Sequence, residues 1–215
     1  FFLARSKEEV GDVQEDGSIV LPGGIVIPAQ HERIVRVDLD EERYPLQLRT
    51  VKQVSEQARI ALTSGLTHNI MEIITVILRK RQANVDPSGI VIKDKESGRT
   101  ILDVGEEVKK KKKMDECQTQ IEEYLRQGRR QVVFSQFSTA LAHFERRLKK
   151  AGIRVVRFDG STPKALREEI KSNFYRAKNE TPKWDVVLVH FKTGGAGLNL
   201  TAATVTHILD EEWND

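Results

Sequence analysis

The second half of the chain alternates short apolar runs with segments of helical periodicity, and this alternation most constrains the fold. The apolar runs lie at 131–134, 153–158, 186–189 and 205–209, and each has the length and composition of a buried strand. Apolar residues at helical spacing occupy the stretches between the first three runs. Strand and helix in alternation favour a parallel sheet with helices on both faces. We therefore expect an α/β fold with its core at 109–215.

A glycine-rich segment, KTGGAG at 192–197, follows the third apolar run. Parallel α/β sheets hold ligands beyond the carboxyl ends of their strands, which is where this segment begins. Glycine lets backbone N–H groups come close to a phosphate, and Lys192 adds a positive charge at the same place. A phosphate-holding loop and a plain tight connection are both open at this point, because a glycine turn serves either purpose.

Three motifs, in order, resemble those of the Swi/Snf family, the DNA-translocating ATPases of the second helicase superfamily. VVFSQF at 132–137 is similar to the family's fourth motif, and FDGST at 158–162, followed by Arg167, is similar to the next segment, which contacts the DNA backbone. GGAGLNLTAA at 194–203, with DEEWN at 210–214, is similar to the fifth motif. The resemblance implies a second RecA-like lobe, truncated before the sixth motif.

The resemblance also implies which residues bind DNA and which respond to nucleotide. The DNA-binding set is Ser135, Gln136, Ser161, Thr162, Arg167, Lys192, Thr193, Gly194 and Trp213. Gly195, Gly197 and Asn199 lie where the nucleotide state is transmitted to the DNA grip. We expect no catalytic residue and no metal ligand in this chain. Packing for Trp213 and helix capping for Asn199 remain alternatives.

The chain departs from the family pattern at several positions. His190 stands where Ser is usual, which removes a hydroxyl that can contact phosphate, and Thr193 replaces a usual Ala and restores one. Asp215 replaces a usual Pro, so the path of the chain there is open. Ala4 stands where Arg is usual, in a segment similar to the junction between the two lobes.

The first half of the chain is expected to lead into this core. We expect a junction between lobes and a hairpin at 1–30, and a strand with a helical insertion at 31–108. Within the second region, alternating polarity predicts a half-buried strand at 31–40. Helical spacing predicts one helix at 41–62 and a second from a Thr67 cap to a basic end at 78–82. That basic end is either a solvated terminus or a DNA contact.

Five consecutive lysines at 109–113 open the helix that precedes the core. A solvated face and a dedicated DNA contact are the alternatives for this run. The preceding segment, 90–108, reads as a hairpin or a loop. Cys117 falls on the apolar stripe of the helix, so we expect it to pack rather than to react.

Composition restricts the classes of partner. The chain has 215 residues and a net charge of only +3, so nucleic-acid binding requires a local basic surface. A single cysteine excludes an internal disulfide and a CxxC zinc site. The longest apolar runs are too short for a membrane span, and no initiator Met is present, so we expect a piece of a longer intracellular protein, from cytoplasm or nucleus.

Phosphoryl transfer by such motors needs a phosphate cradle, a magnesium-holding Asp and arginine fingers. The sequence holds no GxxxxGK[ST] and no DEAH-like box. We therefore expect ATP and Mg²⁺ to serve the intact protein only, with double-stranded DNA and the missing first ATPase lobe as partners and none of these cofactors bound tightly here. A non-catalytic nucleic-acid or partner-binding module is the main alternative. A Rossmann-type enzyme is disfavoured because no GxGxxG follows the first strand.

Overall fold

A computed structural model describes residues 12–27, 29–63, 70–93, 97–105, 108–175, 182–194 and 198–210. The chain divides into two compact units, 1–36 and 37–215. In the first unit, β1 (Asp12–Val13), β2 (Ile19–Leu21) and β3 (Ile25–Ile27) form a small antiparallel sheet. The expected hairpin is therefore present. The expected inter-lobe junction at its start lies outside the described residues.

The expected strand at 31–40 is wrong. The side chains of Val35, Val37 and Leu39 are partly buried and alternate with exposed neighbours, as the sequence pattern suggests. No strand pairs with this segment in the described part of the chain, and its backbone has no regular structure. Alternating polarity reports which side of an extended chain meets apolar surface, whereas a strand also needs a neighbour for its N–H and C=O groups.

A helical pair and a hairpin open the second unit. Helices α1 (Pro45–Thr63) and α2 (Ile70–Val85) pack against each other, and strands β4 (Val91–Lys93) and β5 (Thr100–Asp103) pair antiparallel. Pro45 begins α1, where its missing N–H costs no intrahelical bond. The second helix extends three residues beyond the predicted end at 82, and the expected cap, Thr67, is outside the described residues.

The buried side chain of Gln47 joins this helical pair to the following helix, α3 (Lys112–Arg126). Its Nε2 donates to the carbonyl oxygens of Ala83 and Asn84, both at 3.1 Å, near the end of α2. Its Oε1 accepts a hydrogen bond from the backbone N–H of Lys112 at 3.0 Å. One amide therefore satisfies backbone groups at a helix C-terminus and at a helix N-terminus, which helices otherwise leave unpaired.

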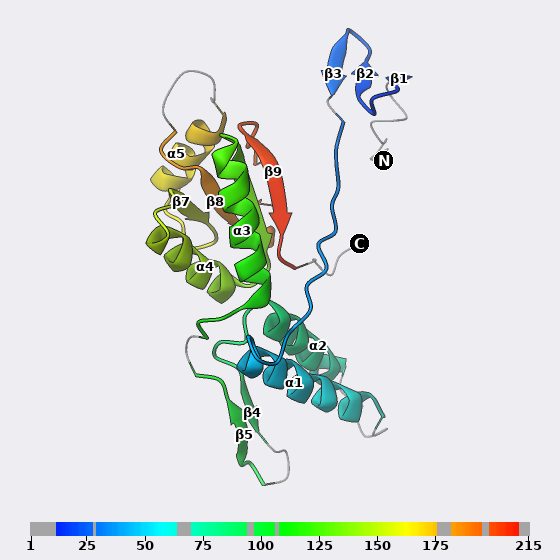
Figure 1. Ribbon diagram of the computed structural model, residues 1–215, viewed down its shortest axis with the longest axis vertical. Coiled ribbons are helices and arrows are strands. Elements are labelled where there is room, and N and C mark those ends of the chain that lie inside the picture. The colour runs from blue at the N-terminus through cyan, green and yellow to red at the C-terminus, as the bar shows by residue number, and fades with distance from the viewer. Residues whose placement is uncertain are drawn as a thin grey trace. The chain divides into compact units, whose positions relative to one another are not determined.

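The remaining elements build the parallel sheet. They are β6 (Arg130–Ser135), α4 (Ser138–Lys150), β7 (Val155–Phe158), α5 (Lys164–Tyr175), β8 (Val186–His190), α6 (Phe191–Gly194) and β9 (Ala203–Ile208). The sheet order is β7-β8-β6-β9, and all three pairings are parallel. Figure 1 shows α3 and α4 together against this sheet. The predicted parallel α/β fold is confirmed.

Two apolar clusters fill the space on the two faces of the sheet. Helices α3 and α4 bury Ile121 and Phe144 against Val133 and Leu188 on one face. Helix α5 buries Phe174 on the other, with Val187 and neighbours. The four residues at 186–189 are fully buried, so the apolar run reads as a central strand packed on both sides. Within the described ranges, no helix is long and apolar enough to cross a membrane.

Glycines with positive φ end the two helices on the first face. Gly128 follows α3 with φ +70°, and Gly152 follows α4 with φ +77°. Both dihedrals lie in the left-handed region, which glycine adopts without steric cost. The packing role expected for Cys117 is confirmed, because its thiol is buried in the α3 stripe, and that burial raises its pKa.

A candidate nucleic-acid interface at the carboxyl edge of the sheet

Parallel pairing brings the motif residues to one edge of the sheet. Ser135, the last residue of β6, lies opposite His190, the last residue of β8. Phe158, the last residue of β7, lies opposite Val189. The segments after β6, β7 and β8 therefore leave the sheet side by side. We call the residues 135–136, 159–162, 190–194 and 209–210 the strand-end edge.

The start of the edge is fixed by Asp210, just beyond β9. Ser135 Oγ donates to Asp210 Oδ2 at 2.5 Å, and the backbone N–H of Gln136 donates to Asp210 Oδ1 at 3.0 Å. Ser135 Oγ also accepts a hydrogen bond from the backbone N–H of Phe137 at 3.1 Å. Ser135 is fully buried, whereas Gln136 is half-buried. Ser135 therefore positions the segment, and the Gln136 side chain reaches the surface.

The turn after β7 is organised by the carboxylate of Asp159. Its Oδ1 accepts hydrogen bonds from the backbone N–H and the hydroxyl of Ser161, at 2.9 and 2.6 Å, and Arg157 Nη1 lies 3.1 Å from its Oδ2. Burial by itself would raise the pKa of Asp159, but the hydrogen bonds from Ser161 and the charge of Arg157 outweigh it and hold the pKa below its ordinary value. The turn thus keeps an ionised Asp159, with Ser161 exposed at its tip.

Arg167 and Thr162 support the same turn from behind. Arg167 Nε donates to the Thr162 carbonyl at 2.8 Å, and its Nη2 donates to the Asp159 and Gly160 carbonyls at 2.8 and 3.1 Å. The hydroxyl of Thr162 accepts a hydrogen bond from the Asp159 backbone N–H at 2.9 Å. That hydroxyl points back to the turn instead of capping α5 as its place in the sequence suggests. Both residues hold the shape that presents Ser161.

The segment after β8 begins as a single helical turn, α6, where a glycine turn is expected. Within it, Lys192 is exposed and Thr193 is half-buried. The backbone N–H of Lys192 donates to His190 Nδ1 at 3.2 Å, so His190 supplies an acceptor where the family pattern has a hydroxyl. Gly194 ends the turn.

Several predicted residues fall outside this description. Gly195, Gly197 and Trp213 lie outside the described residues. Asn199 is described and exposed, and no helix follows it before β9, so it caps no helix within the described ranges. The edge therefore gathers Ser135, Gln136, Ser161, Thr162, Lys192, Thr193 and Gly194, and Arg167 supports it from α5.

The donors at this edge suit phosphate better than a metal ion. Exposed hydroxyl and ammonium groups at Ser161 and Lys192 are typical contacts to a nucleic-acid backbone. A Mg²⁺ site needs carboxylates, and Asp210 and Asp159 already accept hydrogen bonds from Ser135 and Ser161. In the described part of the chain no group of three or more His, Cys, Asp and Glu side chains could hold a metal.

Sequence reasoning missed three carboxylates and their partners. Asp210 looks like part of an acidic box, and only the structure shows it joining the ends of β6 and β9. Asp159 is part of a recognised motif, but its role as the centre of the turn depends on Arg157. Asp86 is far in sequence from Lys111, whose Nζ lies 3.1 Å from the Asp86 carboxylate. The sequence signal that could have indicated Asp159 and Asp210 is a polar residue directly after a buried strand.

Known proteins are similar in sequence to the core that carries this edge. Residues 112–215 match the helicase conserved C-terminal domain family. DNA repair protein RAD5 of Cryptococcus neoformans is 42% identical over 84 residues, which cover 39% of this chain and 7% of that protein. DNA repair protein RAD5B of Arabidopsis thaliana is 38% identical over 87 residues, covering 40% of this chain and 6% of that protein. The chain thus spans less than a tenth of the length of these relatives.

Solved structures show the same fold. The C-terminal domain of the Sulfolobus solfataricus SWI2/SNF2 ATPase superposes with a TM-score of 0.60 at 24% identity, covering 79% of this chain and 69% of that one. The ATPase core of the same organism, in complex with double-stranded DNA, gives a TM-score of 0.58 at 22% identity, covering 83% of this chain and 34% of that one. Residues 112–215 thus match the helicase conserved C-terminal domain, and their fold is that of the C-terminal, RecA-like domain of SWI2/SNF2 ATPases, with the motifs similar to those of the Swi/Snf family at the strand-end edge.

Proposed function

We propose that the chain is the C-terminal ATPase lobe of an ATP-dependent DNA translocase that acts inside the cell in repair or remodelling. The observation that carries this proposal is the strand-end edge, where parallel register gathers the ends of β6, β7 and β8. Relatives that match the core are DNA repair proteins and a Candida albicans helicase SWR1, which is 32% identical over 102 residues. ATP hydrolysis then depends on a first lobe that supplies the phosphate cradle absent from this sequence.

We further propose a division of labour within the edge. Ser161, Lys192 and Thr193 contact successive phosphates of one DNA strand, with Gln136, Gly194 and Trp213 beside them. Ser135, Thr162 and Arg167 hold these groups in place, as their hydrogen bonds suggest. Gly195, Gly197 and Asn199 transmit the nucleotide state to this grip.

DNA binding by the chain over a series of salt concentrations tests the grip. Each phosphate contact releases counterions, so a Lys192→Gln variant should lower the slope of log K against log salt by about 1. Lys52→Gln, an exposed lysine on α1, is the matched control and should leave the slope unchanged. Equal slopes for the Lys192 variant and the unmodified chain would contradict the assignment of the edge.

A non-catalytic binding module is the second candidate, because the sequence itself lacks a GxxxxGK[ST] loop. Joining the chain to a first lobe that carries this loop separates the two functions. A motor lobe should give ATPase activity that DNA stimulates and that Lys192→Gln depresses. A module without motor function would bind DNA in the same assay and leave the ATPase rate unchanged.

A further inference from the structure

A pocket of about 300 Å³ lies on the second unit, and none of its lining residues belongs to the strand-end edge. Val108, Lys109 and Lys111 line it from the segment before α3, and Met114 lines it from α3 itself. Its other wall is α4, with His143, Arg146, Arg147 and Lys150. We call this the α3–α4 pocket.

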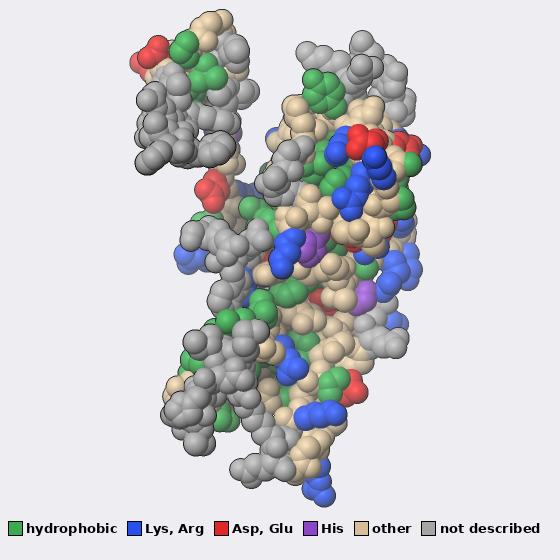
Figure 2. Space-filling model, turned by 180° about the vertical axis from the view of Figure 1, so that it is seen from behind, with side chains coloured by type: hydrophobic (Ala, Val, Ile, Leu, Met, Phe, Trp, Pro, Cys, Tyr) green, Lys and Arg blue, Asp and Glu red, His purple; other side chains and the backbone are tan. Residues whose placement is uncertain are grey.

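The lining of this pocket is strongly basic. Of its eight residues, five are Lys or Arg and none is acidic. On the face drawn in Figure 2, by comparison, Lys and Arg are scattered among other side chains. Because the net charge of the whole chain is only +3, this concentration does not follow from bulk composition.

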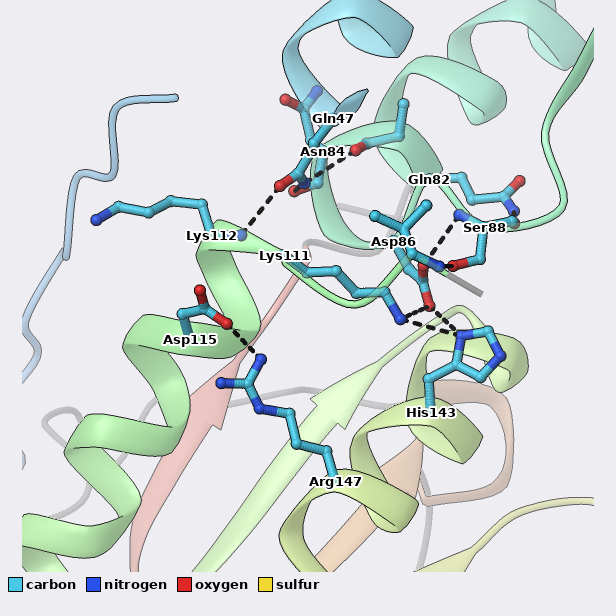
Figure 3. A network of polar contacts seen from close by, with 12 residues as sticks. Gln47, Gln82, Asn84, Asp86, Ser88, Lys111, Lys112, Asp115, His143 and Arg147 are labelled. Carbon is cyan, nitrogen blue, oxygen red and sulfur yellow. Dashed lines mark hydrogen bonds and ion pairs between the residues drawn. The ribbon is translucent and has the colours of Figure 1, made fainter. Parts of the chain in front are cut away.

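Two of the pocket cations are held in place by buried or half-buried acids. Lys111 Nζ lies 3.1 Å from Asp86 Oδ2, and its side chain is only 4% exposed. His143 Nδ1 lies 2.6 Å from the same oxygen, and Arg147 pairs with Asp115. Figure 3 shows Lys111 and His143 directed toward Asp86. These contacts form a rigid floor, to which Lys109, Arg146 and Lys150 add positive charge.

Helix stability explains only part of this arrangement. Arg147 and Lys150 lie in the last turn of α4, where cations complement the helix dipole. Lys109 and Lys111 come from a different segment, before α3, so the dipole of α4 does not account for them. Because Lys111 and Arg147 are already paired with Asp86 and Asp115, a bound anion would meet chiefly the exposed charges of Lys109 and Lys150.

We propose that the α3–α4 pocket binds phosphate groups of a polyanion, either a free oligophosphate or a nucleic-acid backbone. The exposed side chains of Lys109 and Lys150 line the pocket from two different segments, together with Arg146, and Lys and Arg are the side chains that bind phosphate. The buried side chains of Val108 and Met114 line the same pocket beside these cations. The site is separate from the DNA grip of the proposed function.

Titration of the chain with tripolyphosphate and, in a second arm, with a short DNA duplex tests this proposal. The double variant Lys109→Gln and Lys150→Gln removes two exposed pocket cations without disturbing the buried floor. It should weaken tripolyphosphate binding by about tenfold or more, since each charge-assisted contact is a strong one. Lys52→Gln with Lys93→Gln, two exposed lysines elsewhere, removes the same net charge and should change binding less than about twofold.

The two arms identify the source of the phosphate. If the pocket variant binds both tripolyphosphate and the DNA duplex more weakly, the pocket also binds nucleic acid. If only tripolyphosphate binding is weakened, the pocket binds a free oligophosphate. Equal losses in the pocket and control variants, or no tripolyphosphate binding by the unmodified chain at millimolar concentration, would overturn the proposal. Lys192→Gln should leave the tripolyphosphate arm intact, which keeps this test independent of the strand-end edge.

Discussion

Replacing Lys111 by Met should be among the more damaging single changes in this lobe. The change deletes the ammonium that lies 3.1 Å from Asp86 and leaves a carboxylate with a side chain only 1% exposed. Removing one partner of a buried ion pair typically costs about 3–5 kcal/mol of unfolding free energy. Asp86 keeps the backbone N–H of Ser88 at 3.0 Å and His143 at 2.6 Å, so we expect a smaller loss, about 2–4 kcal/mol.

Urea unfolding at pH 7, followed by circular dichroism, measures this loss. The neighbouring Lys110 is exposed, so Lys110→Met is the control and should shift the unfolding free energy by less than about 0.5 kcal/mol.

Hydrogen bonds and the charge of Lys111 hold the pKa of Asp86 below its ordinary value, against the effect of burial. The contribution of Asp86 is therefore fully present above about pH 4, and is lost as the pH falls through the lower folded-state pKa.

Adding Asp86→Asn to Lys111→Met completes a double-mutant cycle. If the two groups stabilise the fold as a pair, the second change should cost much less in the Lys111 variant than alone, with a coupling free energy of about 2 kcal/mol. A loss below about 1 kcal/mol for Lys111→Met, with an unchanged denaturant slope, would refute the reasoning.

Three further predictions concern His207, Cys117 and Ser135. Burial lowers the pKa of His207 to about 4, so stability should fall as the pH drops from about 6.5 to 4, because the unfolded chain takes up a proton that the folded chain refuses. The unfolding free energy, measured as a function of pH, should lose at most about 3 kcal/mol through this group. His207→Leu should reduce that loss between about pH 6.5 and 4, and an unchanged pH dependence in this variant would contradict the prediction. Cys117 should react with a thiol reagent only as fast as the chain unfolds, and rapid labelling under native conditions would disprove its burial. Ser135→Ala should cost about 1–3 kcal/mol, because Asp210 loses a buried donor, and thermal melting without a shift would show that this hydrogen bond is dispensable.

Periodicity and turn residues predicted most of the core. The apolar runs that became β6, β7, β8 and β9 were recognisable because a strand buried on both faces needs continuous apolar sequence. The apolar stripe of α3, which includes Cys117, was predictable from its helical spacing. These patterns depend on local spacing, which sequence displays directly.

Long-range pairing accounts for what was not predicted. Five lysines in a row look alike, yet Lys111 is buried and Lys109 is exposed, because Asp86 lies next to only one of them. The position of Asp210 beside Ser135 likewise depends on the adjacency of β6 and β9, which are separated in sequence by the 67 residues at 136–202. Partners of this kind are set by topology, and composition carries no sign of them.

The amide of Gln47, shared between the end of α2 and the start of α3, has a mechanical consequence. It is completely shielded from solvent, so water cannot replace either contact if the two helices shift. A displacement of α1 and α2 relative to α3 would therefore break hydrogen bonds of the Gln47 amide. We expect these helices to move together, because that motion keeps the hydrogen bonds. A force on helices α1 and α2 should then be passed directly to α3 and to the sheet on which α3 packs.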